Sequence, residues 1–199
     1  MRKFIKLYMS VDQTSSTLEK VELLSRYFNE VGDKDKVWMI ALIIGRRPKR
    51  VITTSLLREW AGELAGIENW LIEESYKVVG DRVETLSKII PVRVQDNNPI
   101  TSLATLMTLL TELKSESDET KKRVVIDTWS QLNADGRFLF NKLITGGFRI
   151  ELSQKTLVKA LSKLINEEES IITYKLMRCL LYTSPSPRDQ RGSRMPSSA

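Results

Sequence analysis

The amino-acid sequence predicts an all-α fold. Apolar residues recur every three or four positions through most of the chain, which places them on one face of successive helices. Glycine, proline and helix-capping serine residues divide these runs into segments of helix length. Alternating apolar and polar positions, which are typical of half-buried strands, are nearly absent. These patterns indicate a compact multi-helix domain of about nine or ten helices.

The first signals come early in the chain. Ser16 and Glu19 have the spacing of a capping box, at the start of a run whose apolar face consists of Leu18, Val21, Leu24 and Phe28. Residues 36–45 are apolar almost all round. They are therefore predicted to form a buried helix that ends at Gly45.

Three further helices are predicted before residue 91. The first runs through Leu57 and Trp60 and is closed by Gly66. The second ends at Gly80, and its helix face is predicted to consist of Trp70, Leu71, Glu74 and Val78. The third ends before Pro91, because proline lacks the amide that would continue the helix.

Residues 92–100 contain two asparagines and a proline and are predicted to be a loop. Beyond this loop the helical spacing returns. It predicts five more helices, over residues 101–115, 117–133, 134–145, 154–165 and 167–177. Asn133 and Ser153 are the predicted N-caps of the third and fourth of these.

Composition limits the classes of protein that the chain can be. Its 199 residues are 41% hydrophobic and 28% charged, as in one soluble globular domain with or without a tail. No apolar run approaches the ~20 residues of a membrane span. The single cysteine, Cys179, excludes an internal disulfide, and with no secretory signal the expected location is the cytoplasm. The net charge of +6 permits a polyanionic partner without establishing one.

From about Cys179 the composition changes to proline and serine without helical periodicity. The stretch "LLYTSPSPRD", followed by "SRMPSSA", resembles translated sequencing-adapter sequence. We therefore expect a helical domain over residues 1–177 and an unstructured, non-native tail over residues 178–199, which plays no part in the fold.

Residues for catalysis are missing. The chain has no histidine, which removes the usual general base and the commonest zinc ligand. No phosphate-binding loop of the G-x-x-x-x-G-K-[ST] type occurs, and no cysteine or carboxylate cluster has metal-ligand spacing. We expect no catalytic residue, metal or cofactor within this chain.

The candidate binding residues lie in two basic segments. One is "GRRPKR", which holds Arg46, Arg47, Lys49 and Arg50 without an acid. The other joins two helices and contains Gly146, Gly147 and Arg149 before the Ser153 cap, followed by Gln154 and Lys155. Amides at a helix start, here those of residues 154–156, form a phosphate site together with nearby cations. Arg137 and Lys142 are predicted as further contacts.

A purely structural explanation of these residues remains open. A double glycine usually ends a helix, a serine cap is routine, and a basic cluster is usually a solvated surface. Taken alone, the residues favour that explanation over a binding site.

Two long stretches resemble a known family. "LIIGRRPKRVITTSLLREWAGELAGIENWLIEESYKVVGD" and "LNADGRFLFNKLITGGFRIELSQKTLVKAL" look like the N-terminal DNA-binding domain of bacterial ATP-dependent DNA ligases. The likeness extends from Met1 to Met177. It implies a monomeric all-α domain that grips nicked double-stranded DNA through the minor groove without reading sequence. In the parent ligase an adenylation domain and an OB domain would follow in the same chain, and ATP and Mg²⁺ would serve the sealing of nicks in repair, recombination and replication.

The resemblance assigns DNA contacts to the two basic segments, and it has departures. Glu151 stands where such ligases tend to carry glycine, and Arg82 and Val83 stand where "GDLAET" is frequent. The adenylated-lysine motif K-x-D-G is absent, since "NADG" at residues 133–136 has asparagine in the lysine position. The chain is therefore expected to be inactive as a ligase by itself. The alternatives are a helical scaffold that binds proteins and not DNA, and a complete small enzyme, of which we expect no activity.

Overall fold

The computed structural model describes residues 1–91 and 102–183, and this part of the chain contains helices and no strands. The all-α prediction is confirmed. The described helices are α1 (Arg2–Asp12), α2 (Thr17–Glu30), α3 (Asp33–Ile43), α4 (Thr54–Ala65), α5 (Asn69–Val79), α6 (Arg82–Ile89), α7 (Leu103–Leu113), α8 (Asp118–Gln131), α9 (Ala134–Ile144), α10 (Gln154–Ile165) and α11 (Glu169–Thr183). The whole predicted loop at 92–100 and residues 184–199 of the predicted tail lie outside the described residues.

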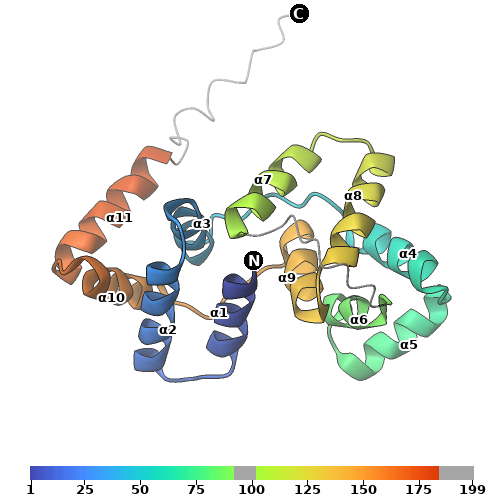
Figure 1. Cartoon of the computed structure of the whole chain (residues 1–199), viewed down its shortest axis with the longest axis horizontal. Helices are drawn as coiled ribbons and strands as arrows, with labels where there is room; N and C mark the ends of the chain where they lie inside the picture. The colour runs from blue at the N-terminus through green and yellow to red at the C-terminus, as the bar shows by residue number, and fades with distance from the viewer. Residues whose placement is uncertain (92–101, 184–199) are drawn as a thin grey trace, which may run out of the picture.

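The helices form two groups that lie side by side (Figure 1). In the first group α10 packs along α2, with α1, α3 and α11 around this pair. In the second group α6 packs against α9, with α4, α5 and α8 around them. Helix α7 packs on α3, and contacts of α1 with α9 join the two groups. Buried side chains of both groups form one hydrophobic core.

Capping residues explain where the helices begin and end. The side chains of Ser16, Thr53, Asp81, Ser102, Ser117, Asn133 and Ser153 each accept a hydrogen bond from a first-turn amide. At the other end, Gly66 and Gly80 adopt left-handed backbone conformations with φ of 66° and 81°. The predicted caps at Ser16, Asn133 and Ser153 and stops at Gly66 and Gly80 are confirmed.

Some expectations about buried faces are wrong. In α5 the predicted face points to solvent: Trp70 is 62% exposed and Val78 is 89% exposed, whereas Ile72 is buried. Leu18 is likewise exposed, and α3 is only half buried because Val37 faces solvent. The spacing of apolar residues shows that a helix has an apolar face. Where apolar residues occur on two faces, as in α5, the spacing does not show which face packs on the core. The opening helix α1, which buries Phe4, Leu7 and Val11, had no separate prediction from periodicity.

Arg137 is a structural residue and not a DNA contact, so the prediction for it is wrong. Only 1% of its surface is exposed. Its Nε donates to the Trp129 carbonyl at 2.7 Å, and its Nη1 donates to the Ile90 carbonyl at 2.8 Å. Burial lowers the pKa of this guanidinium, but an arginine remains charged at neutral pH. The buried charge is tolerated because carbonyl groups surround it.

None of the helices described for residues 1–91 and 102–183 is long and apolar enough to cross a membrane.

Replacing Arg137 with methionine should lower the free energy of unfolding by about 2–4 kcal/mol, because it leaves buried carbonyls without donors. Urea denaturation followed by circular dichroism measures this change. Arg123→Met, at an exposed position on α8, is the control and should change it by less than about 0.5 kcal/mol. Equal effects of the two substitutions would show that the Arg137 hydrogen bonds do not stabilise the fold.

Candidate nucleic-acid interface

Two chain segments cross between the helix groups. The first connection, residues 44–53, runs from α3 to α4, and the second connection, residues 145–153, returns from α9 to α10. They are joined where they pass, because the amides of Val51 and Ile52 both donate to the Ile144 carbonyl, at 2.9 and 3.4 Å. Both segments that were singled out from the sequence therefore lie next to each other.

A glycine with a left-handed backbone conformation starts each connection. Gly45 follows α3 with φ of 86°, and the Arg46 amide reaches back to the Ala41 carbonyl at 2.8 Å. This pattern is a Schellman motif, which ends the helix and releases an extended chain. Gly146 follows α9 with φ of 73°, and its amide donates to the Leu143 carbonyl at 3.1 Å.

Gly146 lies against the first connection without a steric need for glycine. A Cβ atom built on it would lie 3.5 Å from the Cβ of Arg50 and 3.6 Å from the Arg50 amide nitrogen, which is ordinary van der Waals contact, so the constraint at this position is the positive φ. Gly147 lacks that constraint: its φ is not positive, and the nearest atom to a built Cβ is the Thr145 hydroxyl at 3.7 Å. Only the first of the two glycines is required by the backbone.

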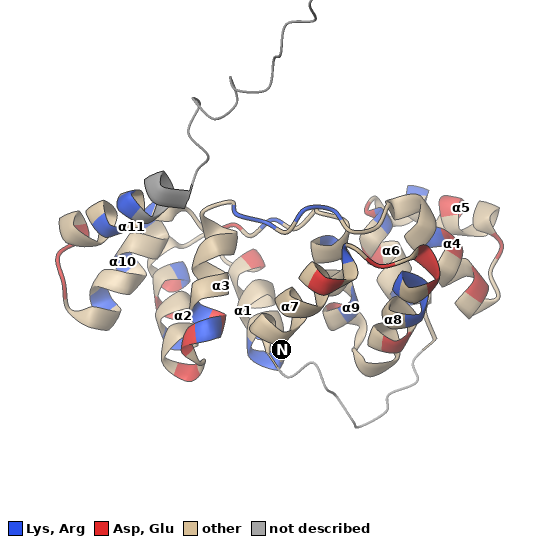
Figure 2. Cartoon of the chain, turned by 90° about the horizontal axis from the view of Figure 1, so that it is seen from above, with Lys and Arg blue, Asp and Glu red and all other residues tan. Residues whose placement is uncertain are grey.

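The first connection runs along one side of the molecule, where Figure 2 shows its lysine and arginine positions in blue. Arg47, Lys49 and Arg50 are exposed, and none of them has an ion-pair partner within the described part of the chain. Arg46 is half-buried. The predicted basic patch is thus present on the surface as a run of neighbouring positive charges.

The second connection alternates inward and outward side chains. Phe148 and Leu152 are buried, and the Phe148 ring lies 5.9 Å from Phe4 and 5.6 Å from Tyr8, measured between centroids. Because successive residues of an extended chain point to opposite sides, Arg149 and Glu151 both face solvent. The buried ring therefore anchors the connection and turns Arg149 outward.

Glu151 places a negative charge beside Arg149. Its carboxylate lies 3.4 Å from Nζ of Lys20, a residue of α2. The Glu151 side chain is 72% exposed, so this ion pair contributes little to the stability of the fold. The ammonium group of Lys20 nevertheless partly compensates the negative charge of Glu151. Together the two connections carry five cations and this one acid.

The start of α10 meets the prediction with one correction. Ser153 caps the helix, and its hydroxyl accepts the Thr156 amide at 3.1 Å. That amide was expected to be unpaired and is not. The amides of Gln154 and Lys155 have no hydrogen-bond partner within the described residues, and both side chains are exposed. The helix start thus retains two amide donors and one lysine for an anion.

Lys142, predicted as a further phosphate contact, forms an ion pair within the fold. Its ammonium group pairs with the carboxylate of Asp81 and lies 5.2 Å from the centroid of the Phe138 ring. Burial alone would raise the pKa of Asp81, but hydrogen bonds from Lys142 and from two backbone amides outweigh it and lower this pKa. Lys142 therefore joins α9 to the start of α6.

No cluster of three histidine, cysteine, aspartate or glutamate side chains within the described residues could hold a metal ion. Asn133, in the "NADG" look-alike of the lysine motif, is a helix cap whose side chain accepts the Gly136 amide at 2.9 Å. What the two connections offer is a set of exposed cations and helix-start amides, which suit an anion.

A family model described as DNA ligase N terminus matches residues 1–162 of this chain. The match contains both connections, all helices from α1 to α9 and most of α10. No curated protein matches the chain.

Gly146→Ala should lower the free energy of unfolding by about 1–2 kcal/mol, because alanine is strained at a positive φ. Gly147→Ala is the matched control and should stay within about 0.5 kcal/mol of the parent protein. Urea unfolding of the two variants gives the comparison. A Gly147 variant as unstable as the Gly146 variant would contradict the assignment of the constraint to one glycine.

Proposed function

Because this chain belongs to the family of N-terminal domains of ATP-dependent DNA ligases, we propose that it binds nicked double-stranded DNA without reading its sequence. The observation that supports this most is the pair of crossing connections, which gathers Arg47, Lys49, Arg50 and Arg149 beside the start of α10. Phosphate groups carry no base identity. Contacts from arginine, lysine and helix-start amides therefore give affinity without sequence preference.

The proposed role is that of one part of a ligase. The ligase reaction forms a lysine–AMP intermediate, and the K-x-D-G lysine for this step is absent from the chain. We therefore propose that an adenylation domain and an OB domain act on the DNA that this domain holds, with ATP and Mg²⁺ bound there. On this proposal the domain works as a monomer in the cytoplasm, and its contribution is to position the nick.

A helical scaffold that binds proteins is the second candidate function. The observation in its favour is the outer face of α5, where Trp70, Leu71 and Val78 are exposed. Exposed apolar patches of this kind often mark protein contacts. The two functions predict opposite outcomes in a DNA-binding experiment, because only the first requires that the chain bind the duplex.

Binding of a nicked duplex should weaken steeply with salt. A protein that neutralises ~4 to 6 phosphates has a log–log salt slope of about −4 to −5. In the triple variant Arg47→Gln, Arg50→Gln and Arg149→Gln, the slope should become shallower by about 3 units, and affinity at 0.1 M salt should fall by at least about tenfold. Fluorescence anisotropy with a labelled nicked duplex measures both quantities.

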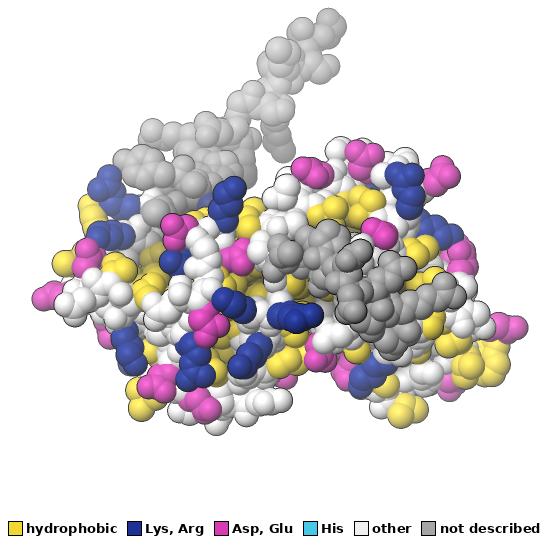
Figure 3. Space-filling view, in the orientation of Figure 1, with side chains coloured by type: hydrophobic (Ala, Val, Ile, Leu, Met, Phe, Trp, Pro, Cys, Tyr) yellow, Lys and Arg dark blue, Asp and Glu magenta, His cyan; other side chains and the backbone are white. Residues whose placement is uncertain are grey.

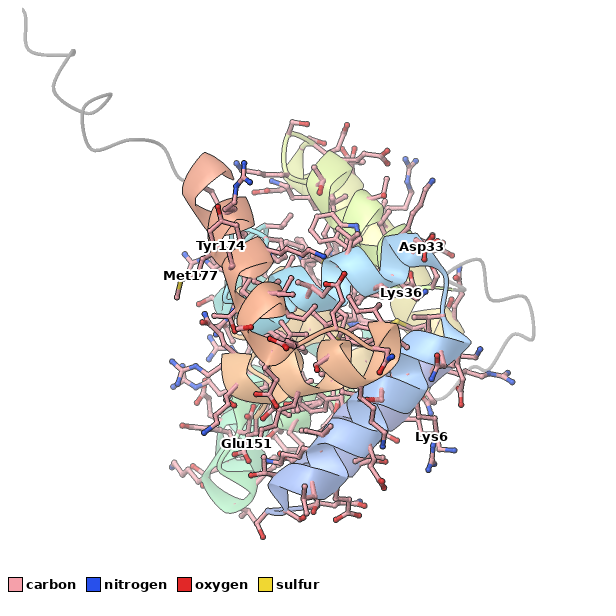
Figure 4. All side chains as sticks on the ribbon, turned by 90° about the vertical axis from the view of Figure 1, so that its left-hand side faces the viewer. Lys6, Asp33, Lys36, Glu151, Tyr174 and Met177 are labelled. Atoms are coloured by element: carbon pink, nitrogen blue, oxygen red, sulfur yellow. The ribbon has the colours of Figure 1, made fainter. Side chains whose placement is uncertain are left out.

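The control variant removes as many charges from another face. Lys3, Lys6 and Arg26 line a shallow cleft between α1 and α2. Figure 3 shows lysine and arginine side chains gathered over these two helices, and Figure 4 places Lys6 on the opposite side of the molecule from Glu151. Changing these three residues to glutamine should leave the salt slope nearly unchanged. Equal losses in both variants would indicate a general charge effect, and absence of binding by the parent protein would favour the scaffold.

A further inference from the structure

A cleft in the second helix group lies directly beyond the basic connection. The first turns of α4 form one wall, α5 forms another and α6 closes it, and its volume is about 340 Å³ including the open mouth. Its lining residues are Thr54, Ser55, Arg58, Ile72, Glu73, Tyr76, Arg82, Thr85 and Leu86. Thr54, in this lining, is the first residue of α4 and comes four residues after Arg50, so the cleft lies next to the end of the first connection.

We propose that this cleft binds a phosphate group of the DNA backbone, as an additional contact outside the two connections. The inference rests on the proposed function, since it extends the DNA path from the first connection over α4 and α6. It also assigns a role to Arg82, which stands where related sequences often carry leucine.

Arg82 supplies the uncompensated charge of the cleft. Its guanidinium lies 4.8 Å from the centroid of the Tyr76 ring, and this cation–π contact holds the group in place. No acid within the described residues forms an ion pair with it. The N–H groups of a guanidinium that stacks on a ring remain free to donate in the plane of the group.

Arg58 adds a donor without adding net charge. Its Nη1 atom pairs with the Glu73 carboxylate, so these two charges compensate each other. Its Nε atom is buried and has no hydrogen-bond partner within the described residues. A buried N–H without an acceptor is unfavourable, and an anion in the cleft would provide that acceptor.

The start of α4 faces the same space. Thr53 caps the helix by accepting the Leu56 amide at 3.3 Å, while the amides of Thr54 and Ser55 have no partner within the described residues. These amides and the positive end of the helix dipole favour an anion. With the single uncompensated charge of Arg82, the cleft matches a phosphodiester, which carries one negative charge.

The experiment compares the salt dependence of binding to a nicked duplex for three variants. Arg82→Leu should make the log–log salt slope shallower by about 1 unit and weaken binding about five- to tenfold at 0.1 M salt. Arg58→Lys, which keeps a cation for Glu73 but lacks Nε, should weaken binding without changing stability substantially. Lys88→Gln is the control, because Lys88 is an exposed cation of α6 that pairs with Glu84 outside the cleft. Its slope should equal that of the parent protein.

Titration with inorganic phosphate, followed by NMR of the Thr54 and Ser55 amides and of Arg58 Nε, separates this inference from the proposed function. Saturable shifts in the parent protein that vanish in Arg82→Leu would support the cleft as a phosphate site. If the duplex binds but Arg82→Leu keeps the parent slope and phosphate causes no shifts, the cleft assignment is wrong and the proposed function stands. If phosphate shifts these signals but no duplex binds, the proposed function is wrong and the cleft is an anion site of another kind.

Discussion

Hydrogen bonds to the carbonyl of Ile144 hold the two basic connections against each other. This carbonyl accepts the amides of Val51 and Ile52, and it thereby sets the register of the first connection against the end of α9. The left-handed φ of 73° at Gly146 turns the chain from α9 into the second connection. Phe148, buried against α1, then holds the second connection. Cations on two extended segments would otherwise be free to spread apart, as their mutual repulsion favours.

The position of Ile144 in turn depends on a polar network within the second helix group. Arg137 donates to the Trp129 carbonyl, and the Trp129 indole donates to the Asn141 side chain at 2.7 Å. These two bonds join α8 to α9. Arg137 also donates to the carbonyl of Ile90, at the end of α6. Buried polar groups of this kind fix one arrangement of helices, because every alternative leaves a donor or an acceptor unpaired. Arg137, in the first turn of α9, thus helps to hold the helix that ends at Ile144.

Much of the fold could be predicted from the sequence, because helix ends are local signals. Ser153, Asn133, Gly66 and Gly80 act within a few residues of themselves, so their roles could be identified without tertiary information. The pairing of the two basic segments could not, since it depends on backbone hydrogen bonds between residues far apart in the chain. For the same reason Arg137 and Lys142 were assigned as contacts: a sequence does not show that a cation is buried or paired. The sequence also does not show that Trp70 and Val78 of α5 face solvent or that Arg82 lines a cleft, because both depend on how the helices pack.

The central claim is that one face, formed by the two crossing connections, holds the DNA. Amide hydrogen exchange of the whole chain with and without a nicked duplex tests this claim most directly, because it reports protection segment by segment. The account predicts that DNA slows exchange in residues 45–50 and 146–155 and leaves exchange on the outer faces of α1 and α2 unchanged. Protection confined to α1 and α2, or to α5, would contradict it.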